Sequence, residues 1–166
     1  LLHNNFIQHE SLINHHISVT SSSFVDNITK TEQKKLMACR DAGFYTQLLL
    51  NPNPEDLHDF LTNHRNKRGY NEPIAQSVTV RVNSRVLYNF LTVSVPEYDR
   101  WSPSVLLLSD TYRHCQNSGI SILDLGTSLD HDGLEKPGLI RFKENVGGIR
   151  GTKDGYFKKL TTSDVN

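Results

Sequence analysis

The 166-residue chain balances 18 Lys and Arg residues against 18 Asp and Glu residues, so its formal net charge at pH 7 is zero. That balance argues against a general electrostatic attachment to nucleic acid, which relies on neutralising several phosphates, and we expect no DNA partner. The length suits one domain with a proper core, and no apolar run is long enough for a membrane span.

The two cysteines, Cys39 and Cys115, are too few for a disulfide framework. Both fall on apolar positions of predicted helices, so we expect buried free thiols. No charged stretch followed by an apolar one opens the chain as a signal peptide would, and we expect a cytoplasmic protein. Leu1 stands where a Met would open a complete chain, which is expected of a trimmed chain or of part of a longer protein.

Residues 1–16 are rich in Asn and His and predict a short amphipathic helix or a connecting segment ahead of a single domain over residues 17–166. The histidines of this stretch have no cysteine or carboxylate cluster at ligand spacing beside them, so no metal site is expected. Residues 17–20 predict an edge strand.

The next part of the chain predicts two helices separated by a strand. Thr29 and Glu32 have the three-residue spacing of a capping box and begin a helix over residues 31–42. Residues 44–50 indicate a strand, and a second helix is expected to begin at Asn53 and Pro54. Apolar residues then alternate over 78–82 and 85–95 around an Asn-Ser turn, which predicts a β-hairpin.

A helix and a buried strand follow this hairpin. Ser102 suits the cap and Pro103 the first turn of a helix, whose apolar residues recur at steps of three and four up to Cys115. Residues 120–125 form a short apolar run that ends in polar and glycine residues, as buried strands do. Open α/β sheets place ligands where such a central strand ends. A second helix over 138–148 and a closing strand over 156–160 complete the prediction.

Three segments, in their order and spacing, resemble the GNAT acyltransferase fold and, more narrowly, its FemAB-like branch: SPSVLLL, GISILDLGTS and GLIRFKENVGG. Members of that branch often read D-F-G-x-S followed by G-L-x-x-F-K-x-x-F-G. Residues 124–128 and 138–148 match these patterns, with Val146 in place of the second Phe. The resemblance covers roughly residues 17–160. It implies an α/β fold with a mixed, mainly antiparallel sheet flanked by helices on both faces.

The resemblance also implies an N-acyltransferase. The acyl group would come from acyl-CoA, such as acetyl-CoA, or from a charged tRNA, and it would pass to a small-molecule or peptidyl amine. No Ser or Cys stands in a setting that would activate a nucleophile, which favours direct attack by the amine. No tightly bound cofactor is expected, and the oligomeric state stays open.

Ordinary GNAT proteins bind the carrier's phosphates with an Arg/Gln-x-x-Gly-x-Gly/Ala loop, whose position here is taken by RWSPS. Arg100 keeps the residue type, but Pro103 removes one N–H donor and both glycines are missing. This departure fits the FemAB-like branch. It is also the main support for an alternative, a non-catalytic GNAT-shaped module that binds a cell-envelope or polysaccharide precursor. The expected cofactor-binding residues are Arg100, Ser102, Ser104 and Val105.

By resemblance, the catalytic residues are Lys143 and Asp124. Lys143 would stabilise phosphate or the negative charge that develops at the acyl centre, and the alternative is a surface lysine paired with a nearby Glu. Asp124 would orient or deprotonate the amine, or it would cap the turn that follows its strand. Arg141 lies two residues before Lys143, so on a helix the two point about 200° apart and only one faces a central cleft. The expected substrate-binding residues are Arg141, Ser128, Tyr98 and Trp101.

Overall fold

The computed structural model describes residues 6–55, 58–59, 73–130 and 132–159, and within them a five-stranded sheet has the order β2-β3-β4-β1-β5. All neighbouring strands are antiparallel except β3 and β4, which run parallel. The mixed, mainly antiparallel sheet with flanking helices is thereby confirmed. In chain order the elements are β1 (Ile7–Ser18), α1 (Phe24–Asn27), α2 (Lys30–Asp41), β2 (Ala75–Arg81), β3 (Val86–Ser94), the 3-10 helix η2 (Pro96–Trp101), α4 (Pro103–Asn117), β4 (Ile122–Thr127), α5 (Pro137–Asn145) and β5 (Ile149–Phe157).

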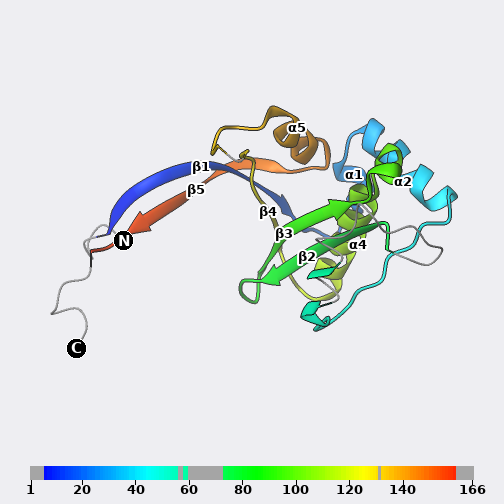
Figure 1. Ribbon diagram of the computed structural model, residues 1–166, viewed down its shortest axis with the longest axis horizontal. Coiled ribbons are helices and arrows are strands. Elements are labelled where there is room, and N and C mark those ends of the chain that lie inside the picture. The colour runs from blue at the N-terminus through cyan, green and yellow to red at the C-terminus, as the bar shows by residue number, and fades with distance from the viewer. Residues whose placement is uncertain (1–5, 56–57, 60–72, 131, 160–166) are drawn as a thin grey trace.

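Strand β1 corrects the helix or connecting segment expected over residues 1–16, because Ile7–Ser18 pairs with β4 on one side and β5 on the other. His15 and Ile17 are two buried positions of this strand. Because one of the two is polar, the sequence lacks the regular apolar alternation by which a strand is predicted. Only the part from Asn14 onward pairs with β4. The earlier part pairs with β5 alone, and Figure 1 shows this two-stranded ribbon extending away from the rest of the molecule.

Helix α4 and strand β4 form as the sequence predicts. The buried stripe of α4 includes Val105, Leu108, Tyr112 and Cys115, and β4 lies in the middle of the sheet. These side chains share one hydrophobic core with residues of the strands, including Leu123, and with buried residues of α1 and α2. In Figure 1, α1, α2 and α4 lie together, and α5 lies beside β1.

Other local expectations are wrong. Thr29 occupies the N-cap of α2, but the capping box is not formed. The Thr29 side chain makes no cap hydrogen bond, its amide donates to the Asn145 carbonyl at 2.9 Å, and the buried Glu32 carboxylate accepts from Lys35 Nζ at 2.8 Å. Residues 44–50 are not a strand, and strand β5 begins at Ile149 rather than at residue 156. The helix expected from Asn53 and Pro54 falls mostly outside the described residues.

Both cysteines are buried and free, as expected. Burial raises the pKa of the Cys115 thiol to about 11 and also raises the pKa of Cys39, so neither side chain is an activated nucleophile. None of the helices in the described part of the chain is long and apolar enough to cross a bilayer.

The turn between α5 and β5 gives a test of the packing. A Cβ on Gly148 would lie 2.5 Å from the carbonyl oxygen of Lys143, so we expect Gly148→Ala to lower the free energy of unfolding by about 1–3 kcal/mol. Gly138, in the first turn of α5, has no atom within 4 Å of the same position. Gly138→Ala should be neutral or stabilising by up to about 1 kcal/mol, and urea denaturation of the two variants would contradict this account if their order were reversed.

Candidate functional site

The site begins where the two parallel strands separate. Strands β3 and β4 pair at only three positions, and the last of these joins Tyr88 to Asp124. Beyond that point β3 pairs only with β2, and β4 pairs only with β1, among the described residues. We call this point the fork. The facing edges of the two strands beyond it present backbone N–H and C=O groups that have no strand partner.

Strand β3 is also irregular at the fork. Val78 and Thr79 are adjacent in β2 but pair with Leu91 and Asn89, so Phe90 is an extra residue in β3. A bulge of this kind bends the strand and redirects its backbone groups, and bulges are frequent beside active sites. The bulge at Phe90 therefore lies in β3 just beyond Tyr88, where the fork begins.

A cavity of about 530 Å³ opens beside the fork, within the usual range for small-molecule sites. One wall is β3 from residue 89 to residue 92, and a second wall is formed by Leu125 and Thr127 of β4. Helix α5 contributes Lys143 and two apolar side chains, and the start of α4 closes the remaining side. The site thus combines an open strand edge, an apolar surface and one buried amine.

The start of α4 faces this cavity through Ser102, Pro103 and Ser104. A helix start attracts anions through its free N–H groups, but few are available here. Pro103 has none, and the Val105 amide donates to the Ser102 carbonyl at 2.9 Å. Asp99 also lines the cavity, and a carboxylate there opposes the binding of an anion. Ser102 is the N-cap residue of α4, as expected, but it has a left-handed backbone (φ 51°) and makes no side-chain cap hydrogen bond.

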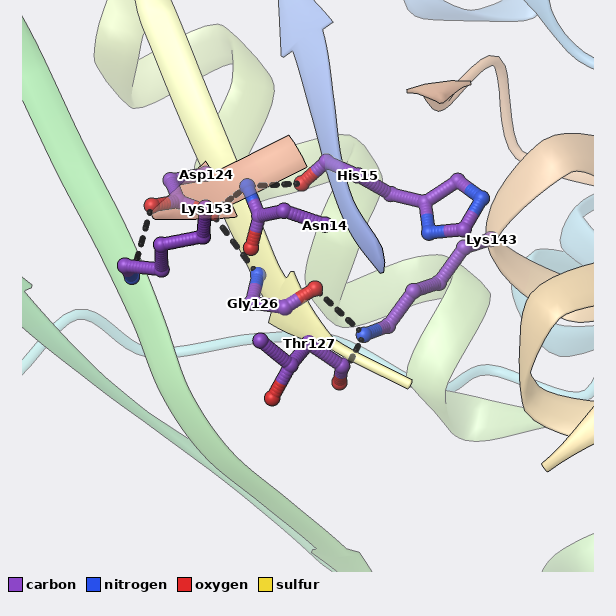
Figure 2. Close-up of polar contacts among 7 residues, drawn as sticks. All are labelled: Asn14, His15, Asp124, Gly126, Thr127, Lys143 and Lys153. Atoms are coloured by element: carbon purple, nitrogen blue, oxygen red, sulfur yellow. Dashed lines mark hydrogen bonds and ion pairs between the residues drawn. The ribbon is translucent and has the colours of Figure 1, made fainter. Parts of the chain in front are cut away.

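Lys143 is a buried residue of the cavity, with 6% of its surface exposed, and the surface lysine considered from the sequence is ruled out. Its Nζ donates to the carbonyl oxygens of Gly126 at 2.8 Å and Thr127 at 2.7 Å, as Figure 2 shows. Burial lowers the pKa of Lys143 to about 8, against the opposing effect of the Asp124 charge. An ammonium has three N–H donors, so one remains beyond the two carbonyl bonds.

A buried histidine stands behind Lys143. His15 is fully buried, with Nδ1 3.4 Å from Ser128 Oγ and Nε2 3.8 Å from a carboxylate oxygen of Glu144. Burial and the Lys143 charge lower the pKa of His15, which favours the neutral ring. Ser128 is fully buried as well and does not line the cavity. Both side chains therefore support the wall of the site from outside the cavity.

Asp124 lies on the other side of β4 from Lys143, and Figure 2 shows Gly126 and Thr127 between the two side chains. One carboxylate oxygen accepts from Asn14 Nδ2 at 2.9 Å and from the Gly126 amide at 2.8 Å. The second oxygen lies 3.4 Å from Lys153 Nζ. Asp124 therefore holds the irregular part of β4 at Gly126, within the strand and not in a turn after it. The structure places Asn14 and Lys153 beside Asp124, and the sequence analysis did not select either residue.

The remaining residues chosen from the sequence do not line the cavity. Tyr98 and Trp101 pack against Phe44, and the Arg100 guanidinium stacks on the Trp101 ring at 3.6 Å. The other two differ in exposure: Val105 is buried in the core, and Arg141 is exposed on α5. None of these five side chains belongs to the cavity lining, so Ser102, Ser104 and Lys143 are the expected residues that meet there.

The pKa of Lys143 makes stability depend on pH. Below pH 8 the ammonium is present in both states and its burial opposes folding. Between the folded pKa of about 8 and the unfolded value of 10.5 the folded protein binds fewer protons, so the free energy of unfolding should rise with pH in that window. Lys143→Met should remove this rise.

Urea denaturation at pH 7.5, 8.5 and 9.5 measures this difference between the wild type and the variant. Arg141→Met, on the exposed side of the same helix, is the control and should shift stability equally at all three values. A stability difference between wild type and Lys143→Met that is the same at each pH would show that the buried amine does not titrate in this range.

Two comparisons with known proteins bear on this geometry. No curated protein matches the sequence. A family model described as an acetyltransferase (GNAT) domain matches residues 29–143, which is more than half of the chain and includes the fork, α4, β4 and most of α5. This match supports an N-acyltransferase in general. The chain therefore belongs to the GNAT acetyltransferase domain family.

Proposed function

We propose that the protein moves an acyl group from acyl-CoA, with acetyl-CoA as the first donor to test, to an amine by direct attack at the fork. The single observation that supports this most is the separation of β3 and β4 beside a 530 Å³ cavity that contains the start of α4 and the Lys143 amine. The open edge of β3 offers amide and carbonyl groups to an extended carrier arm. A buried amine of lowered pKa that lines the cavity favours catalysis over a non-catalytic module.

The reaction joins the amine nitrogen to the thioester carbon while the carbon–sulfur bond breaks. Lys143 would supply the proton that the departing thiolate takes up, and the amine gives up its own proton to solvent or to a base. A thiol has an unperturbed pKa of about 8.5, close to that of Lys143, which suits general acid catalysis. Backbone N–H groups of the bulge around Phe90 are candidates for holding the carbonyl oxygen as it becomes negative.

The choice of carrier depends on the start of α4. A proline, an occupied Val105 amide and the Asp99 carboxylate together make a weaker phosphate site than a glycine loop would. This supports a donor that is held mainly by its arm and is not tightly bound. It also favours the FemAB-like branch, in which a charged tRNA is the alternative carrier. We propose a cytoplasmic protein, and a single acyltransferase domain that includes β1.

A charge at the start of α4 tests the donor site. Ser104→Asp should weaken acetyl-CoA binding at least tenfold, because the new carboxylate would face the donor's phosphates. The same change should leave stability unchanged or raise it by up to about 1 kcal/mol, because an acidic residue suits the positive end of a helix. Ser104→Asn is the matched neutral control.

Thermal unfolding with increasing acetyl-CoA reads out both effects, since ligand at a hundredfold its dissociation constant adds about 2.7 kcal/mol of apparent stability. Equal stabilisation of the Asp and Asn variants by acetyl-CoA would show that the donor's phosphates do not bind at the start of α4. No shift for the wild type at millimolar acetyl-CoA would overturn acyl-CoA as the donor.

The role of Lys143 is tested by kinetics. Lys143→Met should lower kcat about a hundredfold with little change in acetyl-CoA affinity, because the variant loses a proton donor and keeps the cavity. The wild-type rate should fall above pH 8 as the acid form disappears, and the variant should lose this alkaline limb. Arg141→Met is the control and should retain the wild-type profile. A Lys143→Met enzyme with an unchanged alkaline limb would remove Lys143 from the proton transfer.

A further inference from the structure

We propose that one side of the cavity binds an unbranched aliphatic acyl chain of about six carbons, so that the preferred donor is a medium-chain acyl thioester and not an acetyl thioester. Four apolar side chains that line the cavity form this side, which we call the apolar wall: Leu108, Leu125, Leu139 and Phe142. The inference rests on the proposed function, because it names the acyl group that the same cavity would transfer.

The cavity has a polar wall as well as the apolar wall. On the polar side, Asn89 and Thr92 of β3 line the cavity, and Ser77 Oγ donates to Asn89 Oδ1 and lies 3.1 Å from Thr92 Oγ1. The apolar wall comes from other elements, namely α4, β4 and α5. A carrier arm that contains amide groups suits the polar wall, and a chain without polar atoms suits the apolar wall.

The apolar wall is in place before a donor binds. Leu108 and Leu125 are buried members of the hydrophobic core, and Phe142 packs against that core. Leu139 is half-buried and extends the wall along α5. An acetyl group ends in a single methyl group, which can cover only part of four side chains. A longer chain would remove more of this apolar surface from water, which is favourable.

The length of the chain follows from the positions of Leu139 and Lys143 on α5. The two residues are four positions apart, so they share one side of the helix and lie about 6 Å apart along its axis. Lys143 is the proposed proton donor to the sulfur, so the acyl carbon would lie beside it. An extended chain advances about 1.2 Å per single bond, so about five bonds lead from that carbon to Leu139. A hexanoyl chain has this length.

The charges in the cavity favour a neutral acyl group. Lys143 donates to two carbonyls of β4, and with a pKa of about 8 it is positively charged at neutral pH. An aminoacyl group would place its α-ammonium near that charge and against a wall without a carboxylate. Asp99, which also lines the cavity, belongs to η2 and accepts from Ser94 Oγ. We therefore expect a fatty acyl chain and not an amino acid.

The test compares the acetyl and hexanoyl thioesters of N-acetylcysteamine, which share one arm and carry no phosphate. Their binding is measured without an acceptor, from the NMR shifts of labelled leucine methyl groups in the folded protein. Each buried methylene group adds about fourfold in affinity, so four of them add up to about two-hundredfold, and we expect a gain of at least about tenfold. Equal binding of the two thioesters would overturn the proposal.

A variant of Leu139 tests the position of the chain. Leu139→Trp blocks the far end of the apolar wall, so it should weaken hexanoyl binding about tenfold and change acetyl binding by less than about twofold. Leu134→Trp introduces the same ring at an exposed leucine that does not line the cavity, and it should bind both thioesters as the wild type does. A Leu139→Trp protein that keeps the hexanoyl preference would contradict the assigned position. The wild-type comparison decides the chain length even if this variant does not fold.

Transfer assays with the same thioesters separate this inference from the proposed function. The acceptors are a panel of alkylamines, amino acids and lysine-containing peptides. Transfer of acetyl and hexanoyl groups with equal kcat/KM would remove the medium-chain preference alone. Tighter binding of the hexanoyl thioester with no transfer to any acceptor of the panel would support the acyl-chain site and count against the acyltransferase.

Discussion

The central constraint in this protein is that β3 and β4 stay paired for only three residues. Parallel strands that part must leave backbone groups for other partners, and three features hold them apart here. Lys143 donates to two carbonyls of β4, the extra residue Phe90 bends β3, and the Tyr88 ring lies against Gly126. The fork is thus built into the packing, and a ligand that fills it replaces water at groups already exposed.

Lys143 connects that architecture to chemistry. Burial disfavours its charge, while the two carbonyls of β4 each accept a hydrogen bond from the ammonium. A lysine in this balance keeps its proton at neutral pH and still releases it to a thiolate. The neutral His15 ring and the buried Ser128 behind Lys143 add no charge of their own. The remaining N–H of Lys143 is therefore expected to donate to a group in the cavity.

Local pattern predicted the elements that depend on near neighbours, and it failed where distant segments meet. Helix α4 and strand β4 could be predicted from the sequence because their inward residues are apolar. Strand β1 could not, because His15 is one of its inward residues, and its contacts with β4 join residues about 110 positions apart. The motif identified Lys143, yet no spacing shows that Asp124 faces the other side of the strand. Tyr98 and Trp101 stay predicted substrate residues that do not line the cavity, since they pack against Phe44 from η2.

Asp124 and Lys143 lie on opposite sides of β4, but their charges still interact. The Asp124 charge favours the protonated form of Lys143 across β4, and burial acts in the opposite direction. The Asp124 carboxylate therefore helps to set how readily the Lys143 ammonium gives up its proton. A single β-strand keeps the two side chains apart sterically while leaving their charges within range of one another.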